Sequence, residues 1–395
     1  MKLKTALLSV LSVLCLGVGA FVPNIASAQV PGGFPTLPVD TAVRIGKLPN
    51  GLTYFIRHNE EPKGRAEFYI AQKVGSMQEE DSQQGLAHFL EHIAFNGTKN
   101  FPGKGIINFL ESVGASFGGN INAYTSFDQT VYTLMKIPVP RPSVVDSCLL
   151  VLHDWSSFIS LEDKEIDDER GVIQEEWRTR DSGDSRNLER LLAIAYPNNK
   201  YGQRMPIGKM DIIRNFPYQV LRDYYKKWYR PDNQCIIVVG DVDVDHIESE
   251  IKKLWAKSTV PADAAQVVDE QVPDTKEAIY VFGKDKEMPY SQVGFCMKHD
   301  AFPDDQKGDM YYYIDSYAKE IITMMLDQRL EELSQKPDCP FTSASADDGD
   351  YFLSKTKDAF EMSASAKDGK DLESLAAIYR EAQRVRRHGF TAGEY

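Results

Sequence analysis

The segment Gly85-Leu-Ala-His-Phe-Leu-Glu-His-Ile-Ala-Phe-Asn-Gly-Thr98 is the most informative part of this chain for its expected fold and chemistry. Its apolar residues predict a buried helix over residues 83–95. Residues four apart share one face of a helix, so His88 and His92 can present two imidazoles to a single ion, with Glu91 beside them. This spacing predicts a metal site with a carboxylate next to it.

Zinc chemistry explains these residue types. Neutral imidazoles hold the ion, an open coordination position keeps a water, and a nearby carboxylate takes a proton from that water. A chance arrangement is the alternative. It is disfavoured because unpaired histidines and a charge among apolar residues such as Phe89 and Leu90 would be costly to bury.

The third protein ligand must come from elsewhere in the chain. The acidic segment 165–177 predicts a helix, and Glu169 and Glu176 lie seven residues apart, nearly on one face. Both remain candidates on this reasoning.

Strands and helices are expected to alternate through the first half of the chain. Strands rich in β-branched and aromatic residues are predicted at 52–57, 66–74, 121–124, 130–137 and 235–239, and further helices at 105–113, 143–160, 163–179 and 245–255. This half is interpreted as one α+β domain covering residues 29–256.

A change of composition separates the two halves. Residues 257–275 are rich in Pro, Ala, Asp and Val without a clear period, as expected of a linker. Beyond it, strands are predicted at 278–281 and 292–297 and near Tyr351 and Phe360, with helices at 308–333 and 372–387. The similar order suggests a duplicated α+β unit, and the second domain, residues 276–395, is interpreted as truncated.

Residues 1–28 have the form of a signal peptide. Lys2 and Lys4 precede an apolar stretch that ends near Ala26-Ser27-Ala28, a sequence that signal peptidase accepts. We therefore expect an exported protein without a stable membrane span after cleavage.

Composition narrows the partners. The formal net charge of −13 disfavours nucleic-acid binding, which needs a positive surface. Outside the signal peptide the cysteines are Cys148, Cys235, Cys296 and Cys339, without a CxxC spacing, and the sequence does not decide whether they pair. The segment Gly114-Ala-Ser-Phe-Gly118 matches a serine-hydrolase pattern, but it leads from a helix into a strand and lacks the required context.

The chain resembles the pitrilysin and insulysin family of inverted-motif zinc peptidases, which includes the mitochondrial processing peptidases. The resemblance lies in residues 85–98, Asn122-Ala-Tyr-Thr-Ser126, Glu169-Arg-Gly-Val-Ile-Gln-Glu-Glu176 and Tyr229-Arg-Pro-Asp-Asn233. It implies that Glu176 is the third zinc ligand and that Glu169 supports the site. The stretch between His92 and Glu176 is longer than is usual in the family.

The resemblance also implies an activity. The expected function is a zinc-dependent endopeptidase that hydrolyses peptides or small unfolded polypeptides, with one Zn²⁺ per catalytic domain and a water activated by Glu91. The strand with Asn122, Ala123, Tyr124 and Thr125 is expected to pair with the substrate. A second half-enzyme would come from further C-terminal sequence or from a partner subunit. The expected location is the periplasm. The alternative is a non-catalytic scaffold or binding subunit.

Overall fold

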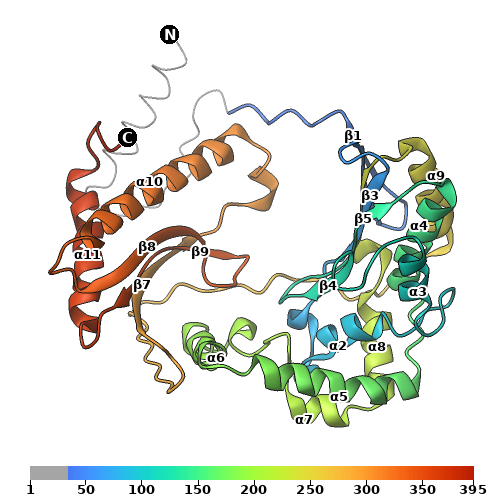
Figure 1. Cartoon of the computed structure of the whole chain (residues 1–395), viewed down its shortest axis with the longest axis horizontal. Helices are drawn as coiled ribbons and strands as arrows, with labels where there is room; N and C mark the ends of the chain where they lie inside the picture. Colours follow the sequence, from blue (N-terminus) through green and yellow to red (C-terminus); the bar gives the residue numbers. More distant parts are fainter. Residues whose placement is uncertain (1–33) are drawn as a thin grey trace. The chain divides into compact units, whose positions relative to one another are not determined.

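The computed structural model describes residues 34–395, which form two compact units (Figure 1). The N-terminal unit comprises residues 40–270 and 278–283, and the C-terminal unit comprises residues 271–277 and 284–395 with the described residues before Asp40. The predicted signal peptide lies outside the described residues. Within residues 34–395, no helix has the length and apolarity needed to span a membrane.

A six-stranded mixed sheet forms the centre of the N-terminal unit. Its strands follow the order β1-β2-β6-β3-β5-β4, in which only the β2–β6 pair is parallel. The bounds are Val43–Lys47 (β1), Thr53–His58 (β2), Arg65–Gln72 (β3), Ile121–Thr125 (β4), Thr130–Pro138 (β5) and Gln234–Gly240 (β6). Strand β4 is therefore an edge strand, with one side free of strand partners.

Alternation along the strands decides which face of this sheet is buried. Phe68 and Ile70 of β3 and Ile236 and Val238 of β6 are fully buried, whereas the residues between them are only partly buried. Successive side chains of a strand point to opposite faces, so one face of the sheet forms a core with the helices.

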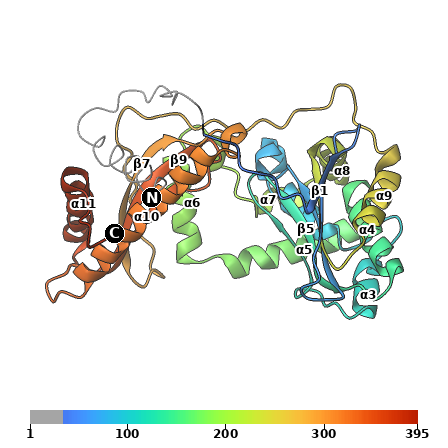
Figure 2. The same cartoon turned by 90° about the horizontal axis from the view of Figure 1, so that it is seen from above.

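The helices of the N-terminal unit are α2 (Leu86–Ile93), α3 (Gly105–Ser112), α4 (Pro142–Ser157), α5 (Asp163–Arg180), α6 (Gly183–Ala195), α7 (Met210–Asn215), α8 (Tyr218–Trp228) and α9 (Val244–Leu254). Helix α4 contacts β3 and helix α9 contacts β2, and both views show these two helices on the same side of the sheet (Figures 1 and 2). Helix α2 contacts β4, β5, α5 and α8. It is therefore surrounded by the elements from which a site could be built.

The C-terminal unit is a smaller sheet with two helices. Strands β7 (Ser291–Asp300), β9 (Lys357–Ala366) and β8 (Phe341–Asp350) pair antiparallel in this order. Helix α10 (Met310–Ser334) contacts β8, and α11 (Asp371–His388) contacts β7 and β9. Leu326, Leu330, Phe341, Met362 and Ile378 form its buried core.

The α+β fold class is confirmed, with corrections in detail. The predicted strand at residues 278–281 is wrong, because this segment has no regular structure, and residues 258–290 contain only turns and bends. The C-terminal unit therefore has one strand before α10, and its order does not repeat that of the N-terminal unit. The strand predicted near Tyr351 is β8, which ends at Asp350, just before that residue. Strand β1 and helices α6, α7 and α8 were not predicted.

Division of the chain into domains at a linker over residues 257–275 stays a proposal. The irregular segment 258–290 is compatible with such a linker. The chain passes from the N-terminal unit to the C-terminal unit within this segment, after Glu270, and returns briefly to the N-terminal unit at residues 278–283.

Candidate metal centre

Helix α2 presents both motif histidines to one carboxylate of helix α5. Nε2 of His92 lies 3.1 Å and Nε2 of His88 lies 3.7 Å from Oε2 of Glu176. One potential ligand atom from each residue falls within 4.8 Å of the other two, and among residues 34–395 this is the one group found with such geometry. The structure therefore brings Glu176 of α5 to His88 and His92 of α2, although Glu176 lies far from both histidines in the sequence.

The polar atoms at this point lack the partners that a closed hydrogen-bond network would supply. Oε2 of Glu176 is buried and receives no hydrogen bond of normal geometry, although the imidazoles are close. A buried carboxylate oxygen without a donor is costly unless a cation completes its surroundings. Two imidazole nitrogens and a carboxylate oxygen form a common donor set for Zn²⁺. The residues present fit a zinc ion.

Outer contacts orient two of these side chains. Oε1 of Glu169 lies 2.9 Å from Nδ1 of His92, and Nδ2 of Asn96 donates a hydrogen bond to Oε2 of the same glutamate at 2.8 Å. Arg180, one turn after Glu176, contacts Oε1 of Glu176 at 2.6 Å. Contact of His92 with a carboxylate through Nδ1 leaves its Nε2 directed at the centre, as metal-binding histidines commonly are.

Glu91 lies beside the centre without belonging to the ligand group. Its Oε2 is 3.9 Å from Nε2 of His88 and accepts a hydrogen bond from Oγ1 of Thr125 at 3.1 Å. Burial raises the pKa of Glu91. A carboxylate with a raised pKa holds a proton more readily, which suits a group that accepts and returns one.

Burial and neighbouring charges push the two histidine pKa values in opposite directions. Burial and the neighbouring His92 lower the pKa of His88 to about 4. Burial also lowers the pKa of His92, but its contacts with Glu169 and Glu176 outweigh burial and raise it to about 10. Contact with His92 lowers the pKa of Glu176. The carboxylates thus draw positive charge into the centre, which a metal ion would supply.

The predicted substrate strand lies next to this centre. Residues 121–125 form β4, the edge strand, with Asn122 and the Tyr124 side chain exposed. Thr125 at its end contacts Glu91, whereas no contact joins Asn122, Ala123 or Tyr124 to the ligand group among the described interactions.

Three contacts of the site were not expected from the sequence. Asn96 is four residues after His92 and Arg180 is four residues after Glu176, so helical spacing was a usable signal for both. Glu79, which contacts the start of α2, has no comparable signal because its position depends on a loop.

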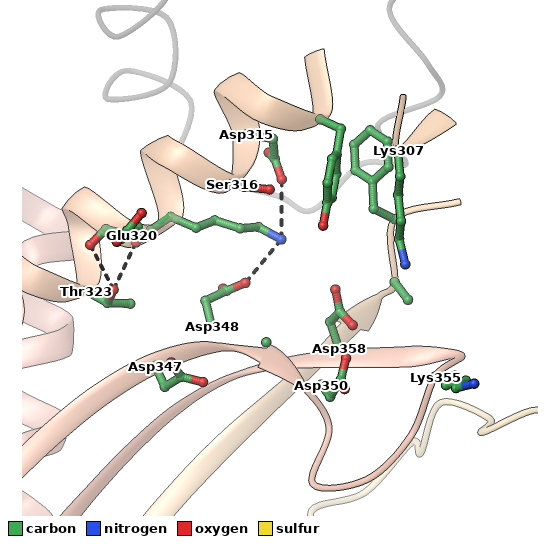
Figure 3. A pocket seen from close by; sticks show the side chains of 15 residues that line it. Lys307, Asp315, Ser316, Glu320, Thr323, Asp347, Asp348, Asp350, Lys355 and Asp358 are labelled. Carbon is green, nitrogen blue, oxygen red and sulfur yellow. Dashed lines mark hydrogen bonds and ion pairs between the residues drawn. The ribbon is translucent and has the colours of Figure 1, made fainter. Parts of the chain in front are cut away.

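A second group of charged residues lies in the C-terminal unit and shares no residue with the metal centre. A cavity of about 270 Å³ lies between α10 and β8 and contains both acidic and basic side chains. Lys319 bridges Asp315 and Asp348 at 3.4 and 3.1 Å (Figure 3). An ammonium group already occupies the space between these carboxylates, so the cavity does not have the character of a cation site.

Comparison with known proteins places the chain in a class. Residues 54–206 match the family "Insulinase (Peptidase family M16)", and residues 215–395 match "Peptidase M16 inactive domain". The chain belongs to this family of peptidases, M16, and the relatives and fold are those of a metalloprotease.

Particular relatives are zinc proteases by name. The chain is 32% identical to "Probable zinc protease PqqL" of Escherichia coli over 94% of its own length and 39% of that protein. It is 40% identical to the Haemophilus influenzae protein of the same name over 60% of its length and 26% of the relative. The crystal structure of the first half of the periplasmic protease PqqL from Escherichia coli superposes with a TM-score of 0.79 at 30% identity, covering 91% of this chain and 76% of that one. The chain thus spans well under half the length of these two curated relatives.

Proposed function

We propose that this chain carries the active centre of a zinc-dependent endopeptidase acting on peptides or small unfolded polypeptides. The observation that supports this most directly is the convergence of His88, His92 and Glu176 within 4.8 Å, with Glu91 beside them. The complete set of ligands and base favours an enzyme over a non-catalytic scaffold.

In the proposed mechanism His88, His92 and Glu176 hold the ion. A bound zinc ion would supply Lewis acidity, polarising the peptide carbonyl and making a water more acidic. Glu91 accepts the proton of the attacking water at its carboxylate and returns it to the departing amine as the C–N bond breaks. Thr125 orients Glu91 through its hydrogen bond, and Glu169 orients His92.

Strand β4 is the proposed place of the peptide. An extended peptide can add to the free side of an edge strand through main-chain hydrogen bonds, which depend little on side chains. Thr125 contacts Glu91, so a peptide bound along residues 122–125 would run next to the catalytic carboxylate. Specificity for a sequence would then come from neighbouring side chains.

The setting and the partners of the whole protein are also proposals. The first 28 residues have the form of a signal peptide, and the Escherichia coli relative is described as a periplasmic protease. We propose export to the periplasm. The relatives are much longer, so we further propose that the working enzyme has a second half, in the same chain or a partner subunit.

The test is Glu91→Gln, which keeps the shape of the side chain and removes its basicity. Cleavage of an internally quenched peptide should fall by roughly 10²- to 10⁴-fold, the usual contribution of acid–base catalysis. Zinc content, measured by atomic absorption, should stay near one ion per chain.

Glu175→Gln is the matched control, because Glu175 pairs with Arg178 on the exposed side of α5. It should cleave like the wild type. Wild-type cleavage by Glu91→Gln would refute the proposed base, and a purified wild type that holds no zinc would refute the metal centre.

A further inference from the structure

The start of helix α2 lacks a capping side chain of its own. The N-cap residue is Gly85, in a left-handed conformation with φ of 103°, and no side chain of this residue accepts a backbone N–H. The first N–H groups of a helix have no partner within the helix, and an apolar setting makes them costly to leave unpaired. Some other group must accept them.

Glu79 supplies that acceptor from outside the helix. Its Oε2 accepts the N–H of Gly85 at 3.0 Å, and its Oε1 accepts the N–H of Ala87 at 2.8 Å. The side chain is almost completely buried, at 1% exposure. Both carboxylate oxygens are therefore engaged by the backbone at the helix N-terminus, where the helix dipole also favours a negative charge.

A buried arginine accompanies this carboxylate. Arg204 is 4% exposed, donates through Nε to the backbone carbonyl of Glu79, and pairs with Asp81. Burial, the strongest influence, raises the pKa of Glu79, while the backbone N–H groups of Ala87 and Gly85 and the charge of Arg204 favour the ionised form. The two N–H contacts, and not this shift, define the cap.

The backbone around the cap leaves little freedom for adjustment. A Cβ on Gly208 would lie 2.2 Å from Cα of Gly85, and the N–H of Lys209 donates to the carbonyl of Gln84. The segment that carries Arg204 is therefore packed against the chain just before α2. Helix α2 is held at its origin both by Glu79 and by this contact.

His88 and Glu91 lie within the two turns that follow the cap. His88 is the third residue of α2, directly after Ala87, whose N–H is bound by Glu79. A displacement at the start of the helix would move both side chains relative to Glu176, which belongs to a different helix. A displacement of about 1 Å can reduce catalysis by roughly 10²-fold.

We propose that Glu79 is a positioning residue of the metal centre: its buried carboxylate caps α2 and thereby sets the places of His88 and Glu91. This inference rests on the proposed function. It assigns Glu79 no contact with the substrate or the ion.

The decisive variant is Glu79→Gln, because it preserves the volume of the side chain and changes only its hydrogen-bonding character. A glutamine has one acceptor oxygen and one NH₂ group, so one of the two backbone N–H groups would face another donor. A side chain that merely fills space would tolerate this exchange. A capping side chain would not.

Three readouts separate positioning from general stability: the rate of zinc release to a chromogenic chelator, the absorption spectrum of the Co²⁺-substituted protein, and kcat and KM on a quenched peptide. For Glu79→Gln we expect zinc release about 10-fold faster or more, a changed Co²⁺ spectrum, and kcat lower by roughly 10- to 100-fold with little change in KM. Glu80→Gln is the control, because the Glu80 side chain is 63% exposed and pairs with Lys227. It should match the wild type in all three.

Glu79→Asp keeps the charge but is one methylene shorter, so it should reach one amide and give intermediate values. It decides the question if Glu79→Gln does not fold. Wild-type zinc release and kcat in a folded Glu79→Gln or Glu79→Asp protein would overturn the inference, even with a lower Tm. The proposed function would stay intact after such a result, provided that the wild type binds zinc and the His88→Ala variant does not.

Discussion

The proposed metal centre of the N-terminal unit and the charged cavity of the C-terminal unit both gather carboxylates beside a histidine, yet they differ in how the negative charges of these carboxylates are compensated. In the cavity, Asp348 lies against His299 and against Lys319, which also reaches Asp315. In the proposed metal centre, the groups closest to Oε2 of Glu176 are two imidazoles, with Nε2 of His92 at 3.1 Å and Nε2 of His88 at 3.7 Å.

The difference shows what distinguishes a cation site from a polar cavity. In the cavity, the ammonium group of Lys319 already lies between two carboxylates and takes the place that a cation would have. The proposed metal centre instead gathers two imidazole nitrogens and a carboxylate oxygen within 4.8 Å of one another, which is a donor set that suits Zn²⁺. A count of acidic residues would favour the cavity, whereas ligand chemistry favours the metal centre.

The largest effect on zinc binding is expected when one carboxylate in each region is replaced by the corresponding amide. Glu176→Gln should reduce zinc affinity by more than the roughly 100-fold seen for outer partners of metal ligands, because it removes a ligand charge. Asp348→Asn should leave zinc content unchanged. Competition with a chelator of known affinity measures both. Zinc loss in Asp348→Asn, or full retention in Glu176→Gln, would remove the distinction between the regions.

A smaller effect is expected from the carboxylate that contacts a ligand without being one. Glu169→Gln should lower zinc affinity or kcat by about 10- to 100-fold, because the amide cannot accept from both His92 and Asn96. Asp168→Asn, on the same helix and paired with Lys164 at the surface, is the control. Equal values for the two variants would show that the contact with His92 has no role in the centre.

The smallest effect concerns stability and the C-terminal unit alone. Hydrogen bonds from Arg329 and from Thr391 lower the pKa of Glu394 to about 2, from an ordinary value of 4.5. A folded-state pKa below the unfolded value contributes stability above pH 4.5, and this contribution is lost as the pH falls towards 2. The protection factors of amide hydrogens in α10 and α11, which correct the exchange rate for its intrinsic pH dependence, should therefore fall over this range.

Glu394→Gln tests this pH dependence. The variant should exchange faster than the wild type at pH 6, and the difference between the two should narrow as the pH falls towards 3. Zinc content should not change. A difference that stays constant from pH 6 to pH 3 would contradict the assigned pKa.

The relation of His88, Glu91 and His92 on one helix could be predicted from the sequence, because their spacing within a helix is local geometry. It also indicated the α+β class through strand and helix periods. It did not choose between Glu169 and Glu176 without the family resemblance, since residues seven apart share a helix face. Nor did it identify residues 278–281 as irregular, because short apolar runs do not specify a strand without a pairing partner.

Which carboxylate oxygen lies against which imidazole nitrogen depends on the packing of distant segments. Glu176 approaches Nε2 of both imidazoles while Glu169 approaches Nδ1 of His92, and this depends on how α5 packs against α2. The position of β4 at the sheet edge and of Glu79 at the start of α2 likewise arise from contacts between distant segments. Local propensity acts within a few residues, whereas these distances are set by packing across the whole unit.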